Sequence, residues 1–309
     1  GAITIGTIYM VFFYTELLNR PLEQIRTQIE DLQRADASIM RISELFRIDS
    51  KIVDGTREDL PSHALSVRFK DVSFSYEQDD RVLHSIQLEL RENNVLGLLG
   101  RTGSGKTTLA RLLLRFYDAT AGEIELGNVP IKDLSLSTLR KRVGIVTQDI
   151  QLFQASVRDN LTLYDTTISD EHISDVLREL GLGKWYNDLP FGLDTEMAVG
   201  GGGLSAGESQ LLAFARVFLK DPGLVILDEA SSRLDPATES LIELAVSRLL
   251  KGRTAIIIAH RLATISRVDE ILILDKGTIV EHGDREQLER DSNSRFYKLL
   301  ASGMEEQLI

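Results

Sequence analysis

The hydrophobic and polar positions of the 309-residue chain follow three successive patterns. Residues 2–18 are mostly apolar, with 12 of 17 positions hydrophobic and Glu16 as the one acid. Residues 22–46 place apolar side chains three, four or seven positions apart, which predicts an amphipathic helix. Residues 49–64 are polar and turn-rich, which predicts a linker. From residue 65 onward, short apolar runs alternate with helical stretches, so a separate folded domain is expected over 65–309.

The apolar run at the start of the chain has two interpretations. As a helix it would extend roughly 26 Å, somewhat less than the ~30 Å of a bilayer's hydrocarbon core. A helix buried in a protein core is one interpretation. Because the run continues into the amphipathic stretch, we favour the other: residues 1–48 are the end of a transmembrane helix and its extension into water. Pro21 is a position where this helix is expected to kink.

The remainder of the chain predicts an α/β fold with a mixed, mainly parallel sheet, because strand-like and helix-like segments alternate. The segment Val-Leu-Gly-Leu-Leu at 95–99 is apolar throughout, as expected of a strand buried on both faces. The predicted strands are 67–69, 72–76, 86–90, 95–99, 143–147, 223–227, 254–259 and 271–274, and the predicted helices are about 107–117, 171–180, 207–220 and 237–250.

The composition removes several functional classes. There is no cysteine, which excludes disulfides, a thiolate nucleophile and cysteine-ligated metals. The net charge of −12 argues against a broad basic face for nucleic acid, so no nucleic-acid partner is expected. A small anion can still be bound, because that needs only a local site.

A local anion site is predicted by Gly100–Thr107, which matches the phosphate-binding pattern G-x-x-x-x-G-K-[ST]. The segment follows the apolar run 95–99 and opens a predicted helix. Its glycines let backbone N–H groups surround a phosphate, and the helix N-terminus adds its positive dipole end. Lys106 can reach the β- and γ-phosphates, and the Thr107 hydroxyl can ligate Mg²⁺. A nucleotide triphosphate with magnesium is therefore the expected ligand.

Two acids complete this prediction. Asp228 and Glu229 follow a second apolar run, and the carboxyl ends of parallel strands are where such sheets bind ligands. Asp228 can hold the magnesium shell, and Glu229 can accept a proton from an attacking water.

Further segments give the chain its resemblance to a known family. Leu204-Ser205-Ala206-Gly207-Glu208 resembles the LSGGQ signature of ATP-binding cassette (ABC) proteins and ends 20 residues before Asp228. Gln148 stands where that family has its Q-loop glutamine, Ser231–Asp235 resembles the D-loop, and His260 resembles the switch histidine. Residues 3–48 and 270–288 resemble the last transmembrane helix and the ending of an ABC exporter half.

The resemblance implies a P-loop NTPase fold with an antiparallel β-subdomain and a helical subdomain at about 150–220. It also implies a function: the ATP-binding and hydrolysing half of an exporter in the cell membrane, with its nucleotide-binding domain on the cytoplasmic side. The implied partners are a second nucleotide-binding domain, the multi-pass transmembrane domain of the full-length chain and an exported substrate of unknown identity.

Residue roles follow from the same resemblance. Glu229 is the expected general base, His260 the contact to the γ-phosphate, and Thr107, Gln148 and Asp228 the residues around Mg²⁺; Gln148 and His260 are also catalytic candidates. The signature Ser205, Ala206, Gly207 and Glu208 would act in trans on ATP held by the partner, beside the D-loop Asp235. The expected nucleotide-binding residues are Tyr76, which would stack on adenine, and Val82, Arg101, Thr102, Gly103, Ser104, Gly105, Lys106, Thr107 and Thr108.

The signature departs from the family pattern at two positions. Ala206 replaces a glycine, and its methyl group would be strained if the backbone φ were positive there. Glu208 replaces glutamine and adds a negative charge near the triphosphate. Two assemblies remain open: a heterodimer in which this signature completes a weaker site, and a homodimer.

Three other functions also remain as alternatives. They are a soluble ABC-type ATPase acting on DNA or ribosomes, a nucleotide-gated regulator with little turnover, and an importer ATPase subunit. The apolar run 2–18 argues against the first and the last, and the presence of Glu229 and His260 argues against the second.

Overall fold

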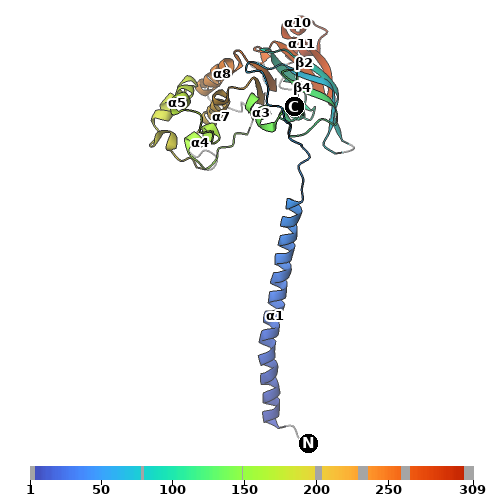
Figure 1. The fold of residues 1–309 in the computed structure, drawn as a ribbon, viewed down its shortest axis with the longest axis vertical. Coiled ribbons are helices and arrows are strands. Elements are labelled where there is room, and N and C mark those ends of the chain that lie inside the picture. The colour runs from blue at the N-terminus through green and yellow to red at the C-terminus, as the bar shows by residue number, and fades with distance from the viewer. Residues whose placement is uncertain are drawn as a thin grey trace. The chain divides into compact units, whose positions relative to one another are not determined.

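The computed structural model describes residues 4–77, 80–147, 149–198, 204–228, 236–258 and 265–302, without the side chains of residues 236 and 237. The chain divides into two compact parts, residues 1–53 and residues 54–309 (Figure 1).

The first part is dominated by one helix, α1 (Ile5–Phe46), which includes Pro21. Thr4 caps its N-terminus by accepting a hydrogen bond from the backbone N–H of Thr7. No residue of this helix is buried in the structure, so its apolar side chains contribute nothing to the core of the chain. Of the helices in the described ranges, none has a stretch with the length and hydropathy that a bilayer crossing requires.

The second part contains two sheets. The larger has six strands in the order β10-β9-β3-β8-β7-β6, all parallel to their neighbours except the antiparallel edge strand β10. The smaller is antiparallel, in the order β2-β1-β4-β5. The predicted mixed sheet and antiparallel subdomain are confirmed. The strands are β1 (Val67–Ser75), β2 (Arg81–Leu90), β3 (Val95–Leu99), β4 (Ala121–Leu126), β5 (Val129–Pro130), β6 (Val143–Val146), β7 (Leu224–Asp228), β8 (Thr254–Ile258), β9 (Glu270–Asp275) and β10 (Thr278–Asp284).

The central strands of the larger sheet are buried on both faces, which explains why β3, β7 and β8 are apolar at nearly every position, with Thr254 and Asp228 at strand ends. On β7, Leu224 and Ile226 pack toward α2 and the small sheet, whereas Val225 and Leu227 pack toward helices α4 to α8. The same alternation holds along the neighbouring strands.

The helices are α2 (Lys106–Leu113), α3 (Leu136–Arg142), α4 (Val157–Thr162), α5 (Asp170–Glu179), α6 (Gly183–Asn187), the 3₁₀ helix η1 (Gly192–Asp194), α7 (Ala206–Lys220), α8 (Pro236–Leu250), α10 (Arg285–Arg290) and α11 (Arg295–Ala301).

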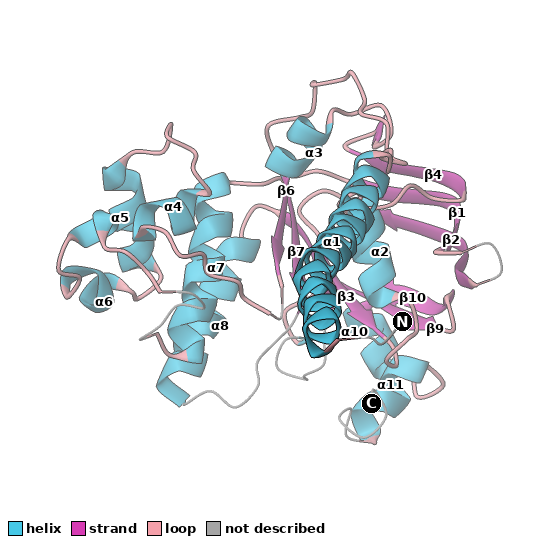
Figure 2. Ribbon diagram, turned by 90° about the horizontal axis from the view of Figure 1, so that it is seen from below, coloured by secondary structure: helices cyan, strands magenta, loops and turns pink. Residues whose placement is uncertain are grey.

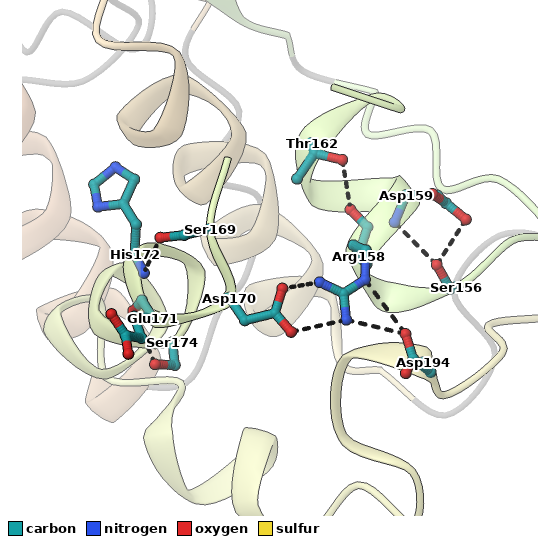
Figure 3. Close-up of polar contacts among 10 residues, drawn as sticks. All are labelled: Ser156, Arg158, Asp159, Thr162, Ser169, Asp170, Glu171, His172, Ser174 and Asp194. Carbon is teal, nitrogen blue, oxygen red and sulfur yellow. Dashed lines mark hydrogen bonds and ion pairs between the residues drawn. The ribbon is translucent and has the colours of Figure 1, made fainter. Parts of the chain in front are cut away.

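The helices α4 to α7 form the helical subdomain, away from strands β1, β2 and β4 (Figure 2). Arg158 of α4 ties three of its segments together, because it binds both carboxylate oxygens of Asp170 at the start of α5 and lies 3.1 Å from Asp194 Oδ1 in η1 (Figure 3). These ion pairs raise the pKa of Arg158 and lower that of Asp170. Two of the segments that Arg158 joins, α4 and α5, contact helix α7.

Residues 54–65 attach directly to the domain that follows them. The backbone N–H of Arg57 donates to Asp133 O at 2.8 Å, and Ser135 donates back to Arg57 O at 2.8 Å. The Arg142 guanidinium donates to the carbonyls of Pro61 and His63. The second half of the predicted linker is therefore hydrogen-bonded to the domain.

Candidate nucleotide-binding site

The sheet register brings the phosphate-binding loop and the acidic strand end to the same edge. Strand β8 lies between β3 and β7, and its Ile258 is the register partner of both Leu98 and Asp228. The loop begins at Gly100, two residues after Leu98. Asp228 therefore stands level with Leu98, two residues before the loop, on the other side of β8.

Lys106 occupies the centre of the loop. Its Nζ donates to Gly100 O at 2.5 Å and to Arg101 O at 3.0 Å, and its side chain is buried. Burial lowers the pKa of Lys106, and the negative charge of Asp228 partly offsets this effect. The loop thus holds a buried cation whose hydrogen-bond partners are the carbonyl oxygens of Gly100 and Arg101.

The loop opens onto the N-terminus of α2. The residue before this helix is Gly105, with φ of 108°, a conformation that glycine adopts without strain. Gly105 has no side chain to cap this helix, and the described residues supply no other cap, so the first N–H groups of α2 can face an anion. The Thr107 hydroxyl is exposed at this end, whereas Thr108 is buried. Arg101, Thr102 and Gly103 form the exposed rim of the loop, and Ser104, Gly105 and Lys106 its buried floor.

The aromatic candidate Tyr76 lies beside the same helix. Its hydroxyl lies 3.1 Å from Thr108 Oγ1 and accepts a hydrogen bond from Arg111 at 3.2 Å. Tyr76 is 38% exposed, and its ring meets that of Tyr117 edge-on, with centroids 5.1 Å apart. Val82 is half-buried at the start of β2. Tyr76 is therefore held firmly next to α2, with part of its ring open to a ligand.

The sequence motifs gave no sign of Tyr117 or Arg111. Tyr117 follows the end of α2 and completes an aromatic cluster with Phe74 and Tyr76. Only the length and direction of α2 bring these side chains together, and neither follows from a local pattern.

Replacing Tyr76 by alanine is expected to weaken ATP binding by about 1–2 kcal/mol, roughly 5- to 30-fold in Kd, through lost stacking. Calorimetric titration of the purified chain measures this. Tyr76→Phe is the matched control, because it keeps the ring and loses only the hydroxyl contacts to Thr108 and Arg111. An unchanged Kd in Tyr76→Ala would place adenine elsewhere.

The signature residues stand at the start of α7. Ser205 is its N-cap, and Ala206 is its first helical residue with no positive φ, so the strain considered for its methyl group does not arise. Gly207 is buried against α8: a Cβ there would lie 1.9 Å from Thr238 Cγ2. This glycine is required for helix packing, whatever else it contacts. Glu208 forms a capping box with Ser205.

Arg216, further along α7, connects the signature helix to the segment that follows position 148. Its Nε donates to Asn160 O at 2.7 Å, and its Nη1 donates to Gln151 O at 2.9 Å. The guanidinium also lies 5.9 Å from the centre of the Phe153 ring. Burial lowers the pKa of Arg216.

Several predicted site residues lie outside the described residues. They are Gln148, Glu229, the D-loop segment with Asp235, and His260. Among the described candidates, the structure brings together the 100–108 loop, Tyr76 and Asp228. The signature Ser205–Glu208 belongs to the separate helical subdomain.

Comparisons with known proteins agree with this arrangement. Residues 83–232 match the family model described as ABC transporter. The chain is 38% identical over 288 residues to "Uncharacterized ABC transporter ATP-binding protein YknV" of Bacillus subtilis (strain 168), an alignment that covers 93% of this chain and 48% of the relative. It is 37% identical to the "ATP-dependent lipid A-core flippase" of Syntrophus aciditrophicus (strain SB), covering 97% of this chain and 50% of that protein.

A solved structure is similar over nearly the whole chain. It is described as "Structure of a bacterial Atm1-family ABC exporter with ATP bound", with a TM-score of 0.77 and 31% sequence identity, covering 98% of this chain and 53% of that one. The chain thus spans about half the length of the relatives it matches.

Proposed function

Because this chain belongs to the ABC transporter family, we propose that it is the ATP-binding and ATP-hydrolysing half of an exporter. ATP binding would join two such domains, hydrolysis would separate them, and the cycle would drive a substrate out of the cell. The observation that supports this most directly is the meeting of the Lys106 loop and Asp228 at one sheet edge. A transmembrane domain elsewhere in the full-length protein would carry the substrate across the membrane.

The chemistry of the loop fits a triphosphate. Phosphate oxygens would replace the carbonyls of Gly100 and Arg101 as partners of the Lys106 ammonium, and the uncapped N-terminus of α2 would face the same anion. Binding would therefore add to the negative charge of Asp228 a direct counter-charge for the buried ammonium, whose hydrogen-bond partners in the loop are neutral carbonyls.

Magnesium is proposed as the cofactor, because hydroxyl and carboxylate oxygens are ligands it prefers. Thr107 presents an exposed hydroxyl beside the loop, and Asp228 acts electrostatically on Lys106 in that loop, so both could hold the ion together with Gln148. When bound, it would neutralise charge on the β- and γ-phosphates. Glu229 and His260 are proposed as general base and γ-phosphate contact.

The second nucleotide-binding domain is proposed to be another copy of this chain or the domain of a different subunit. In either dimer, Ser205 and Gly207 would face ATP bound to the partner's loop, together with Ala206, Glu208 and Asp235. The relatives named above are transporters or carry transporter ATP-binding domains, so an ATPase acting on DNA or ribosomes is not retained.

The mass of the chain in solution distinguishes these assemblies. The Glu229→Gln variant, which should bind ATP without consuming it, is expected to shift from monomer to dimer on addition of ATP and Mg²⁺. Light scattering combined with nucleotide quantification measures the mass and the number of bound ATP molecules. A stable self-dimer with two ATP molecules supports the homodimer. ATP binding without self-association, reversed by adding a separate partner subunit, supports the heterodimer. If no ATP is bound, the proposed function is wrong.

A further inference from the structure

The Glu208 carboxylate occupies the polar groups of the signature serine. Ser205 donates its backbone N–H to Glu208 Oε2 at 2.8 Å and its hydroxyl to the same oxygen at 2.9 Å. In return, the backbone N–H of Glu208 donates to Ser205 Oγ at 3.2 Å. A single anionic oxygen thus takes both hydrogen-bond donors of Ser205.

Those donors are the ones a phosphate would need. Ser205 is exposed, so an oxygen of a partner-bound triphosphate can approach it, and that oxygen can accept hydrogen bonds only from N–H or O–H groups. Both donors of Ser205 already make charge-assisted hydrogen bonds to a carboxylate, and such bonds are roughly twice as strong as neutral hydrogen bonds. The dipole of the 15-residue helix α7 also stabilises the negative charge of Glu208, which lies in the first turn of the helix.

We propose that Glu208 is a built-in competitor of the γ-phosphate at Ser205, and that ATP-driven joining of two domains requires its carboxylate to leave the serine. This inference rests on the proposed function and adds a positioning residue to it. The structure offers space for the displaced side chain, because Ser205 and Glu208 line a cavity of about 440 Å³ together with Lys184, Trp185 and Asp188. The departure from glutamine at position 208 therefore raises the ATP concentration needed for dimerisation.

Glu208→Gln tests the proposal, because glutamine keeps the size and the acceptor oxygen but removes the charge. We expect half-maximal dimerisation at an ATP concentration about five- to tenfold lower than with Glu208, since a neutral acceptor holds Ser205 less strongly. The measurement compares Glu229→Gln with Glu229→Gln/Glu208→Gln, in the homo- or heterodimer that the mass experiment identifies. In the free chain, hydrogen exchange should become several-fold faster in the peptide that contains Ser205 and Glu208.

A comparable control exists in the same subdomain. At α4, Ser156 caps the helix through its hydroxyl, which lies 2.7 Å from Asp159 Oδ2 and accepts the Asp159 N–H at 3.0 Å; the bond from the serine backbone N–H to the carboxylate is specific to Ser205 and Glu208 among these two caps. Asp159→Asn removes a capping carboxylate away from the signature, so it should leave the ATP midpoint unchanged even if it lowers the melting temperature. Monomer affinity for ATP, which depends on the Lys106 loop, should be equal in all variants.

Two results would overturn the proposal alone: an ATP midpoint that moves less than twofold in Glu208→Gln while ATP-dependent dimers still form, or an equal shift in Asp159→Asn. The absence of any ATP-dependent dimer in every variant, with self or partner, would instead contradict the proposed function and the inference with it.

Discussion

Replacing Lys106 by alanine is expected to raise the Kd for ATP by roughly 10- to 100-fold, because hydrogen bonds to charged groups contribute about 1.5–3 kcal/mol. The ammonium is buried in the free protein and bonded only to the carbonyls of Gly100 and Arg101 among the described residues. A bound triphosphate would give it a full negative counter-charge in a site of low dielectric constant. The side chain thus contributes more to the complex than to the free chain.

Calorimetric titration with Mg²⁺-ATP measures this loss, and Lys276→Ala is the control. Lys276 is exposed in the turn between β9 and β10 and lines a cavity together with Gly100 and Arg101, so it supplies positive charge near the loop without entering it. If affinity for ATP depended only on the total positive charge near the loop, Lys106→Ala and Lys276→Ala would raise the Kd equally. A Kd for Lys106→Ala within about twofold of the unmodified chain would mean that the phosphates bind elsewhere.

The sequence predicted the central strands well, because burial on both faces leaves a continuous apolar run whose short length favours a strand over a buried helix. Strands β3, β7 and β8 lie at or within one residue of their predicted positions, as far as the described residues extend. The small elements were not predicted. Helix α3 buries only Leu139, and β4 combines acidic and apolar positions because Glu123 and Glu125 pair with Lys70. Neither leaves a periodic apolar signal.

Helix α2 shows a different limit. The apolar pattern predicted a helix to about residue 117, but it ends at Leu113, and Arg115 adopts a positive φ of 51°. The Arg115 guanidinium is buried and pairs with Asp118 and the carbonyl of Leu134. A tertiary contact therefore overrides the local helical preference.

The candidate site could be predicted where it is local and not where it depends on side-chain geometry. The loop 100–107 is a strand-turn-helix unit whose motif carries its own conformation. The Glu208 substitution was visible in the sequence, and a serine followed three residues later by a glutamate ahead of an apolar run is the pattern of a capping box, so the bonds of Glu208 to Ser205 could have been predicted from it. The strand register on both sides of β8, which brings Asp228 to the same sheet edge as the loop, is by contrast known only from the folded sheet.

Glu229→Gln is expected to leave ATP binding intact and to reduce turnover by at least about 100-fold, the lower range for loss of a general base. Glu229 directly follows Asp228 at the end of β7, the sheet edge at which the phosphate loop begins. Glutamine preserves the size of the side chain and its hydrogen bonding, but it cannot accept a proton from water at neutral pH. The nucleotide should therefore remain bound as the triphosphate.

Phosphate release under saturating Mg²⁺-ATP measures turnover, and the Kd from titration measures binding. Asp228→Asn is the matched comparison: it changes the neighbouring carboxylate, so it is expected to weaken the Mg²⁺ dependence of binding as well as the rate. A change in rate without a change in Kd thus belongs to position 229, and a change in both to position 228. Equal turnover in Glu229→Gln and the unmodified chain would exclude Glu229 as the base and would direct the search to another proton acceptor beside the γ-phosphate.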